Sequence, residues 1–339
     1  MVFSLSRALV ISSILLVVRI VSTSSLPIDL AAQVTAQLPD AIVEVPTSKE
    51  QWIGVERCDL STADALVCLL LDKIDGSVIA RAPKLRVIAN CAVGYDNVDV
   101  AAATRAGIAV TNTPDVLTDA TAEFTIALMF AAARRLPEGE ALVRSGGWIG
   151  WRLDQLLGQP IRGRTLGIVG MGRIGQAVAA RAAALGMHIL YAEPHDVATP
   201  FPARRVPVDD LFGQADVVSL HCPLTSETRH LVNAERLARM KPTAILLNTA
   251  RGGCVDDRAL ADALQTGRIA AAGLDVFDGE PAIDACLLAA PHLVLAPHLG
   301  SATTRARTQM AQLCADAVLS VLTGKRPTNL VNREVVLRG

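Results

Sequence analysis

Aromatic side chains are scarce in this chain: only 3% of its 339 residues are Phe, Trp or Tyr, although 51% are hydrophobic. The core must therefore be aliphatic, a composition typical of parallel sheets covered by helices. An excess of charge of one sign is also missing, because 32 basic residues face 33 acidic ones. With this balance, no overall electrostatic attraction would hold the chain to a phosphate backbone or an anionic surface. We expect no nucleic-acid partner and no stable membrane association.

Cysteine pairs of the kind that bind zinc are absent. The seven cysteines, at positions 58, 68, 91, 222, 254, 286 and 314, include no CxxC and no paired spacing. We expect buried small hydrophobic residues in a reducing compartment, a cytoplasmic location and no metal site. Cys254 lies near a motif discussed below, but the expected role is that of a bystander.

The apolar run at the amino terminus, Ala8 to Val18, has the length of a signal-peptide core and is short for a membrane span. Arg19 interrupts it. Residues 1–18 are an apolar extension, for which a signal peptide, a membrane anchor and an over-long start assignment are all open. We favour the last, because Arg19–Ser22 already has the pattern of the first strand, which cleavage after the serines would remove.

The length predicts two domains, and short apolar runs alternate with helical stretches. Strands are expected at 19–22, 65–71, 85–92 and 108–113, and in a second series at 165–170, 188–193, 217–222, 244–249, 270–276 and 293–296. Helices are expected at 119–135, with Thr118 as N-cap and a stop before Pro137, and at 173–185, 257–267 and 301–323. This alternation predicts α/β architecture with doubly wound parallel sheets.

A glycine motif, Gly170-Met171-Gly172-Arg173-Ile174-Gly175, directly follows an apolar strand and opens a helix. Missing Cβ atoms let the backbone approach a pyrophosphate at the helix N-terminus. Glu193 ends the next strand, where its carboxylate would accept hydrogen bonds from ribose hydroxyls and repel a 2′-phosphate. We therefore expect NAD(H) in preference to NADP(H). Arg204 and Arg205 leave some room for NADP(H), although we interpret them as exposed charges before a strand or helix.

Three further strand ends supply the polar groups that carbonyl reduction of a 2-keto acid requires. Arg251 has the planar fork that binds carboxylate and carbonyl oxygens. His298 can give and retake a proton near neutrality, and Glu280 beside the imidazole would favour its protonated form. Each has a structural alternative: a histidine in the core, a helix-capping arginine, a loop carboxylate. All three structural alternatives would have to be true at once for these residues to have no catalytic role.

These residues resemble the D-isomer-specific 2-hydroxyacid dehydrogenase family, and within it the glyoxylate/hydroxypyruvate reductase branch. The resemblance covers the chain from about Arg19 to Asn332. The stretches that carry it are ANCAVGYDNVDV (89–100), NTPDVLTDATAE (112–123), LGIVGMGRIGQ (166–176), HCPLTSETRHL (221–231), NTARGG (248–253), AGLDVFDGEP (272–281) and APHLGSAT (296–303).

The resemblance implies an NAD(H)-dependent oxidoreductase that reduces a small 2-keto acid, with Arg251, Glu280 and His298 as its catalytic residues. It also implies two groups of binding residues. Backbone amides of Val93 and Gly94 would bind the substrate carboxylate. The cofactor would contact Asp275 at its nicotinamide carboxamide, Thr121, Thr249 and Ala250 in motifs that face it, and Cys222, Pro223 and Thr228 on the adenosine side.

The same resemblance implies a cofactor domain, 114–303, inserted in a split substrate domain, 19–113 and 304–339. It further implies a homodimer, in which a tryptophan of the Trp148 and Trp151 segment approaches the neighbouring subunit's active site. A phosphoglycerate dehydrogenase-like enzyme, a D-lactate-type enzyme and a non-catalytic NADH-sensing corepressor of the same fold stay open. The complete Arg, Glu and His set favours an enzyme over the corepressor.

Overall fold

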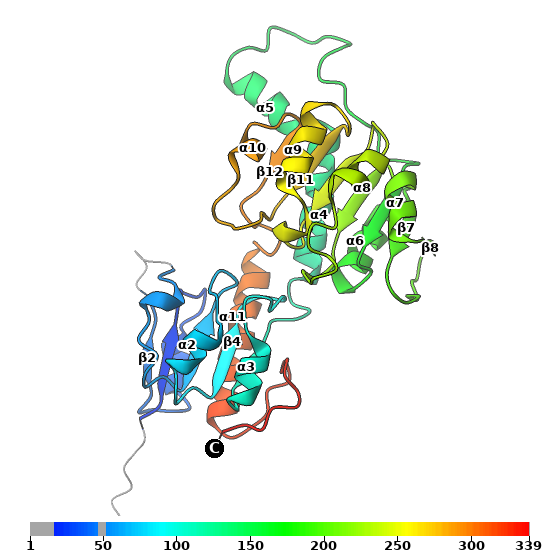
Figure 1. Ribbon diagram of the computed structural model, residues 1–339. Coiled ribbons are helices and arrows are strands. Elements are labelled where there is room, and N and C mark those ends of the chain that lie inside the picture. The colour runs from blue at the N-terminus through cyan, green and yellow to red at the C-terminus, as the bar shows by residue number, and fades with distance from the viewer. Residues whose placement is uncertain (1–16, 47–51, 339) are drawn as a thin grey trace, which may run out of the picture. The chain divides into compact units, whose positions relative to one another are not determined.

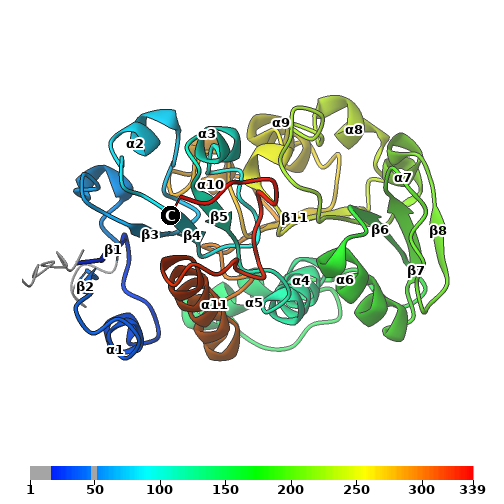
Figure 2. The ribbon, with the colours of Figure 1, turned by 90° about the horizontal axis from the view of Figure 1, so that it is seen from below.

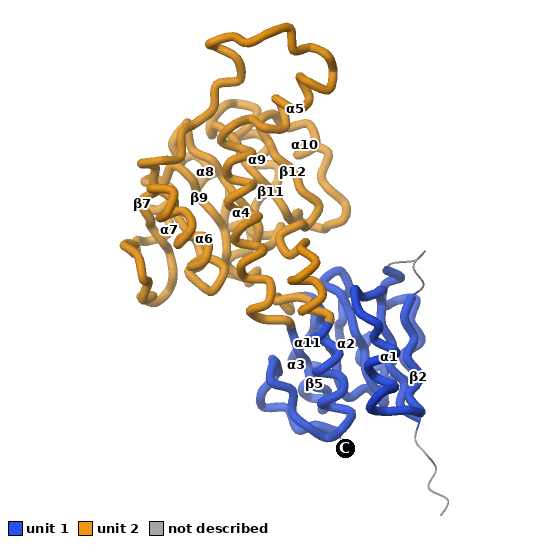
Figure 3. Tube along the Cα trace, turned by 180° about the vertical axis from the view of Figure 1, so that it is seen from behind, with its two compact units in different colours: residues 1–91, 97–112, 312–339 blue, residues 92–96, 113–311 orange. Residues whose placement is uncertain are grey.

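The computed structural model describes residues 17–46 and 52–338, so the apolar extension predicted for residues 1–18 lies almost wholly outside the described residues. The chain divides into two compact units (Figure 3). Unit 1 contains residues 1–91, 97–112 and 312–339, and unit 2 contains residues 92–96 and 113–311. Each unit is built around a parallel sheet with helices on both faces, as the alternating pattern predicts (Figures 1 and 2).

Unit 1 has a five-stranded sheet in the order β2-β1-β3-β4-β5, and all its strand pairs are parallel. The strands are β1 (Arg19–Ser22), β2 (Ile42–Glu44), β3 (Ala65–Cys68), β4 (Val87–Asn90) and β5 (Ala109–Thr111). Helices α2 (Gly76–Ala80) and α3 (Val100–Arg105) pack on one face. Helices α1 (Leu30–Thr35) and α11 (Thr304–Leu322) pack on the other (Figure 2). A 3₁₀ turn, η1 (Val55–Arg57), precedes β3.

A buried carboxylate orders the loops at the carboxyl edge of this sheet. Asp72 is 1% exposed. Its oxygens accept hydrogen bonds from the Thr23 hydroxyl at 2.6 Å, the Trp52 indole at 3.1 Å, and the backbone amides of Val55 at 3.0 Å and Leu69 at 2.8 Å. Four donors on one buried carboxylate offset the cost of taking its charge out of water. The sequence analysis does not identify this residue.

Unit 2 has a seven-stranded parallel sheet in the order β12-β11-β10-β9-β6-β7-β8. Its strands are β6 (Thr165–Val169), β7 (His188–Ala192), β8 (Ala203–Arg205), β9 (Val217–Leu220), β10 (Ile245–Asn248), β11 (Ala271–Leu274) and β12 (Leu293–Leu295). The chain leaves β6 toward β7 and β8 and then returns to β9 on the other side. The order therefore reverses between β6 and β9, where ligands bind in open α/β sheets.

Helices cover both faces of the larger sheet. On one face lie α4 (Thr118–Ala133) and α6 (Arg173–Ala184). On the other lie α7 (Val208–Gln214), α8 (Ala234–Arg239), α9 (Asp257–Gln265) and α10 (Ala285–Leu288). Strands β6, β9 and β10 are almost continuously buried, as the apolar runs predict. Helix α5 (Leu136–Arg144) and the 3₁₀ turn η2 (Gly252–Cys254) complete the unit.

Two of the four edge strands, β2 and β8, are missed by the sequence analysis, whereas β5 and β12 lie within predicted strands. Both missed strands are three residues long and partly exposed. Arg204 and Arg205 are exposed and precede α7, as predicted, but they also belong to β8, which the sequence analysis misses.

The helix predicted for 119–135 also needs correction at both ends. Thr118 is not the N-cap but the first helical residue, and Leu117 occupies the cap position without a side-chain bond. The helix ends at Ala133 because Arg135 adopts a left-handed conformation with φ 52°. A second helix, α5, then begins, with Pro137 in its first turn, where a missing backbone N–H costs nothing.

The division between units falls inside α11, after Ala311, rather than at the predicted residue 304. The short segment Ala92–Asp96, expected with the first unit, packs with unit 2. Among the described residues, no helix is both long and apolar enough to span a membrane.

Candidate active site

The glycine motif lies where the prediction places it, between β6 and α6. Gly170 adopts φ 94°, and a Cβ there would stand 2.7 Å from the backbone of His221 and Cys222. Only glycine satisfies both the conformation and the close approach. Gly172 occupies the N-cap of α6, and a Cβ built on it meets no atom within 4 Å. The turn thus leaves open space at the helix N-terminus, which fits a bound pyrophosphate.

A pocket of about 930 Å³ opens beside this turn, at the point where the strand order reverses. Five of the residues predicted for the cofactor line it: Gly170, Glu193, Cys222, Pro223 and Thr228. The Thr228 hydroxyl donates to the Pro223 carbonyl at 2.6 Å and accepts from the Thr225 amide at 2.7 Å. These bonds fix the conformation of the loop after β9, which forms one wall of the pocket. The size and position of the pocket fit the adenosine half of a dinucleotide.

Charge in this pocket is arranged around Glu193. Its carboxylate accepts a hydrogen bond of 2.7 Å from the Met171 amide of the glycine turn. The Arg205 guanidinium donates to the carbonyls of Glu193 at 2.8 Å and Pro194 at 2.5 Å and lies 3.4 Å from the Asp196 carboxylate. Arg205 therefore binds the loop after β7, and its charge is already partly compensated.

The other three residues of the glycine motif lie at the start of α6. Gly175 is buried and Ile174 half-buried, while the exposed Arg173 forms an ion pair of 2.7 Å with Asp115.

Arg204, which the sequence analysis considered beside Arg205 for NADP(H), is exposed and donates to Gln214 at 2.6 Å.

Arg251 follows β10 and is positioned by a buried asparagine. Asn248 is fully buried, donates to the Arg251 carbonyl at 2.8 Å and accepts from the Ala250 amide at 3.0 Å. The Arg251 Nε donates to Asp96 Oδ1 at 2.9 Å, and Nη1 donates to the Ala250 carbonyl at 2.8 Å. The guanidinium is therefore held at two places.

His298 and Glu280 form a hydrogen-bonded pair. The imidazole Nδ1 and Glu280 Oε1 are 2.7 Å apart, and the side chains are 29% and 19% exposed. An ionised carboxylate only accepts, so Nδ1 carries the hydrogen and Nε2 is left to exchange a proton with a ligand. Glu280 Oε2 accepts from the Phe277 amide at 3.3 Å. The pair has the arrangement of a general acid with its orienting partner.

Asp275 supports the loop that carries His298. It is 1% exposed, and its two oxygens accept hydrogen bonds from the amides of Leu299 at 2.6 Å and Gly300 at 2.7 Å. Burial raises the pKa of Asp275, while the two amides act to lower it. His298 itself adopts φ 54°, a conformation rare for residues other than glycine. The predicted contact of Asp275 with a nicotinamide carboxamide remains a prediction; the backbone bonds are an additional role.

The carboxyl ends of β10, β11 and β12 bring these loops together. A Cβ on Gly252, next to Arg251, would lie 1.8 Å from the Phe277 carbonyl carbon, so the loop that carries Glu280 runs directly against it. Buried Thr121 lies against Gly300. The Thr249 and Thr125 hydroxyls are 2.9 Å apart, which ties β10 to α4. Thr121, Thr249 and Ala250 thus lie at the same sheet edge as the catalytic candidates.

Two buried groups at this edge play no part in acid–base chemistry. Cys254 is fully buried in the core, beside the Cys222 sulfur. Burial lowers the pKa of His221 to about 3, so its imidazole is neutral and pairs with the Ser219 hydroxyl at 2.8 Å. In the described part of the chain, no cysteine forms a disulfide bond. In residues 17–46 and 52–338, no group of three or more His, Cys, Asp or Glu side chains could hold a metal ion.

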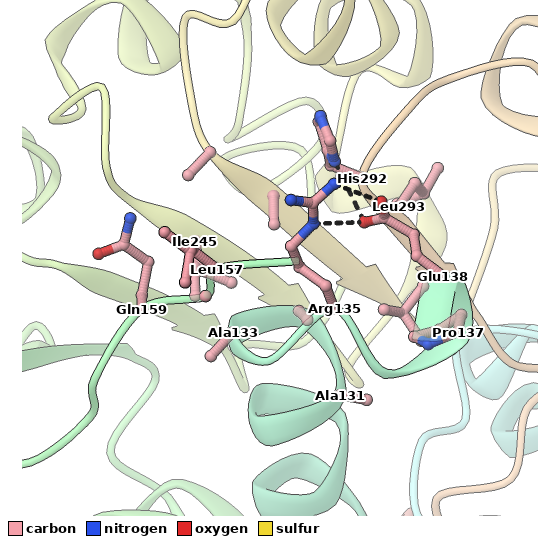
Figure 4. A pocket seen from close by; sticks show the side chains of 15 residues that line it. Ala131, Ala133, Arg135, Pro137, Glu138, Leu157, Gln159, Ile245, His292 and Leu293 are labelled. Atoms are coloured by element: carbon pink, nitrogen blue, oxygen red, sulfur yellow. Dashed lines mark hydrogen bonds and ion pairs between the residues drawn. The ribbon is translucent and has the colours of Figure 1, made fainter. Parts of the chain in front are cut away.

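A second pocket, of about 190 Å³, opens at the opposite edge of the same sheet, where β10, β11 and β12 begin (Figure 4). Arg135 binds Glu138 in a bidentate pair: Nε donates to Oε1 at 3.0 Å and Nη2 donates to Oε2 at 2.5 Å. His292 Nδ1 lies 3.3 Å from the same carboxylate. None of the predicted site residues lines this pocket.

Sequence reasoning misses three polar residues of the site: Asp96, Asn248 and Arg205 in its loop-binding role. The first two stand inside motifs quoted for the resemblance. Asn248 bonds locally, to Ala250 and Arg251, whereas the partner of Asp96 is set by packing. Asp96 and Arg251 are 155 positions apart in the chain.

Comparison with known proteins identifies the chain. Residues 126–300 match the model of the D-isomer specific 2-hydroxyacid dehydrogenase NAD binding domain. The chain belongs to this family. A glyoxylate reductase of Korarchaeum cryptofilum is 51% identical over 86% of this chain and 89% of its own length. The resemblance stated from the motifs is confirmed, and this dehydrogenase is an oxidoreductase that acts on the CH–OH group of 2-hydroxy acids.

Solved structures agree with the fold. A protein from Thermus thermophilus superimposes with a TM-score of 0.84 at 45% identity, covering 92% of this chain and 99% of its own. An NADPH-dependent glyoxylate/hydroxypyruvate reductase from Sinorhizobium meliloti, solved with NADP and malonate, gives 0.81 at 32% identity over 95% and 99%. The predicted architecture of two α/β domains, one inserted in the other, is confirmed.

Proposed function

We propose that this dehydrogenase reduces glyoxylate or hydroxypyruvate with NADH, and that His298 donates the proton to the substrate oxygen. The observation that carries the proposal is the 2.7 Å contact between His298 Nδ1 and Glu280, which leaves Nε2 as the proton-exchanging atom. Arg251 binds the carboxylate and carbonyl oxygens, and the backbone amides of Val93 and Gly94 hold the carboxylate. The names of the curated relatives favour glyoxylate.

A nicotinamide dinucleotide supplies the hydride when bound; everything else in the reaction falls to the protein. Gly170, Gly172 and the start of α6 bind its pyrophosphate, and the pocket lined by Glu193 and Thr228 binds the adenosine. Asp275 holds the His298 loop, and Glu280 orients the imidazole and stabilises its protonated form. In the reverse direction the same pair accepts the alcohol proton.

We assign the cofactor preference to NAD(H). Two observations support this: the Glu193 carboxylate lies in the pocket, where it repels a 2′-phosphate, and the Arg205 guanidinium is engaged by loop carbonyls. The NADPH-dependent Sinorhizobium relative makes the assignment worth testing directly.

The test is a panel of glyoxylate, hydroxypyruvate, pyruvate and 3-phosphohydroxypyruvate, each with NADH and with NADPH. We expect glyoxylate or hydroxypyruvate with NADH to give the highest kcat/KM. A preference for pyruvate or for the phosphorylated substrate would assign the chain to the D-lactate or phosphoglycerate type. Saturable NADH binding without turnover on any of the four would assign it to the sensor type.

The dehydrogenase is also proposed to act as a homodimer in the cytoplasm, with unit 1 as its substrate domain. Support for the dimer comes from the arm, residues 145–160, in which Ile149, Trp151 and Leu153 are 92%, 77% and 82% exposed. Contiguous exposed apolar side chains mark interaction surfaces. Sedimentation of the wild type and of Ile149→Asp tests this: we expect a dimer and a monomer respectively, and a monomeric wild type would exclude the assignment. The cytoplasmic location is supported by the cysteines, which form no disulfide bond among the described residues, as is typical of a reducing compartment.

A further inference from the structure

The Arg251 guanidinium is fixed from two directions within unit 2. Its Nε donates to Asp96 Oδ1 at 2.9 Å, and its Nη1 donates to the Ala250 carbonyl at 2.8 Å. A guanidinium is planar and has five N–H groups, of which these bonds engage two. Bonds to two different nitrogens of a planar group fix the orientation of its plane as well as its position.

Asp96 belongs to the segment Ala92–Asp96, which packs with unit 2 although its neighbours on both sides belong to unit 1. A Cβ on Gly94 would lie 1.5 Å from Arg251 Nη2, 2.6 Å from Cζ and 2.9 Å from Asp96 Oδ1. The backbone of Gly94 therefore lies directly against the guanidinium, and a side chain at position 94 would displace the guanidinium from its present place. The segment supports Arg251 on one side through contact and on another through the carboxylate.

The ion pair is too exposed to matter much for folding. The side chains of Arg251 and Asp96 are 26% and 38% exposed, and pairs of this kind contribute little to stability. A different role follows from the position of the bond. Asp96 engages Nε through one oxygen, whereas a carboxylate that imitated the substrate would be expected to bind two nitrogens of the fork side by side.

We propose that Asp96 is a positioning residue, which fixes the plane of the Arg251 guanidinium so that its remaining N–H groups face the carboxylate of the 2-keto acid. This rests on the proposed function of Arg251 as the substrate-binding arginine. Without Asp96 the arginine keeps its charge but rotates among several orientations, and substrate binding has to select one of them.

The test compares Asp96→Ala and Asp96→Asn with the wild type. Asparagine keeps an acceptor oxygen in place, whereas alanine removes it. We expect kcat/KM for glyoxylate to fall about tenfold or more in Asp96→Ala and by less in Asp96→Asn. The NADH dissociation constant and the Tm should match those of the control variant Asp209→Asn, which removes a similarly exposed pair between Asp209 and Arg236 at 2.8 Å.

Oxalate provides a readout that does not depend on turnover. Titrated into the NADH complex in a calorimeter, it should bind about tenfold more weakly to Asp96→Ala than to the wild type. Tighter oxalate binding would show instead that Asp96 competes with the substrate carboxylate, and equal binding would show that Asp96 has no role; either result overturns the proposal. If Asp96→Ala fails to fold, Asp96→Asn decides.

Failure of the proposed function gives a different pattern. A wild type that binds NADH and oxalate but turns over none of the 2-keto acids contradicts the reductase assignment, whereas the order of oxalate affinities still tests Asp96. A wild type that is active, with variants equal to it, contradicts the role of Asp96 alone.

Discussion

Two histidine–glutamate pairs lie at opposite edges of the seven-stranded sheet, and they differ in what surrounds them. At the carboxyl edge His298 pairs with Glu280 at 2.7 Å; at the amino edge His292 lies 3.3 Å from Glu138. Both histidines adopt φ 54°. A histidine beside a carboxylate is therefore not by itself evidence of an active site.

The two pairs differ in whether an arginine also binds the glutamate. Arg135 binds both carboxylate oxygens of Glu138, through Nε and Nη2, and this bond, with a smaller effect of His292, lowers the pKa of Glu138 (Figure 4). The Arg135 guanidinium thus compensates the negative charge of Glu138, and little of that charge is left to act on the His292 imidazole. At the carboxyl edge Glu280 has only a backbone amide as a second donor in the described structure, and the arginine of that edge binds Asp96 instead. Glu280 is left to act on His298.

Replacing each histidine by alanine should separate the two pairs most clearly. Because a positioned acid contributes about 10²–10⁴-fold, His298→Ala should lose that factor in kcat while keeping NADH affinity. His292→Ala should keep kcat within about twofold. Steady-state kinetics and NADH fluorescence titration measure both. Near-native turnover of the first variant would mean that the proton donor is misassigned.

Replacing each arginine by lysine compares the two guanidinium groups. Lysine cannot reproduce the planar fork, so Arg251→Lys should lower kcat/KM for glyoxylate about 100-fold, chiefly through KM. Arg135→Lys should leave kcat/KM unchanged and lower only the Tm. An unchanged KM in Arg251→Lys would count against its role in binding the substrate.

Replacing each glutamate by glutamine tests the neutralisation argument. Glu280→Gln should lower kcat about tenfold, because the amide no longer stabilises the protonated imidazole. Glu138→Gln should keep kcat and lose about 0.5–1 kcal/mol of stability at pH 7. The folded-state pKa of Glu138 is lowered, so its contribution is present above the ordinary value of 4.5 and disappears as the pH falls through the folded value. Urea unfolding at pH 7 and at acid pH measures this. A difference in unfolding free energy between Glu138→Gln and the wild type that persists at acid pH would contradict the prediction.

The smallest effect concerns unneutralised charge at the carboxyl edge. Burial, with Asp278, Asp284 and Asp256 nearby, raises the pKa of Asp257 from 3.8 to about 6. The folded state then binds the proton more tightly than the unfolded state, so stability falls as the pH rises from about 4 to 6. Asp257→Asn should therefore be more stable than the wild type by about 0.5–1 kcal/mol at pH 7.5, after solvent screening, and equal to it near pH 4. Denaturant midpoints that differ equally at both pH values would contradict this sign.

Much of the site could be predicted because the chemistry resides in strand ends. The apolar runs before Gly170, Arg251 and Asp275 predict buried strands, and parallel strands place their carboxyl ends at one edge, so the three motifs had to meet. The edge strand β8 and the turn at Arg135 were not predictable in the same way. β8 carries no apolar run, and the left-handed turn at Arg135 has no glycine to mark it.

The sequence by itself determined the α/β class, the glycine turn and the identity of the groups that can bind a carboxylate or move a proton, because these depend on local periodicity and side-chain chemistry. The tertiary structure alone decided which carboxylate serves which cation. Asp96 binds Arg251 across 155 positions, and His292 lies against Glu138 across 154. Ion pairing depends on distance in space, and a linear pattern of charges does not contain that distance.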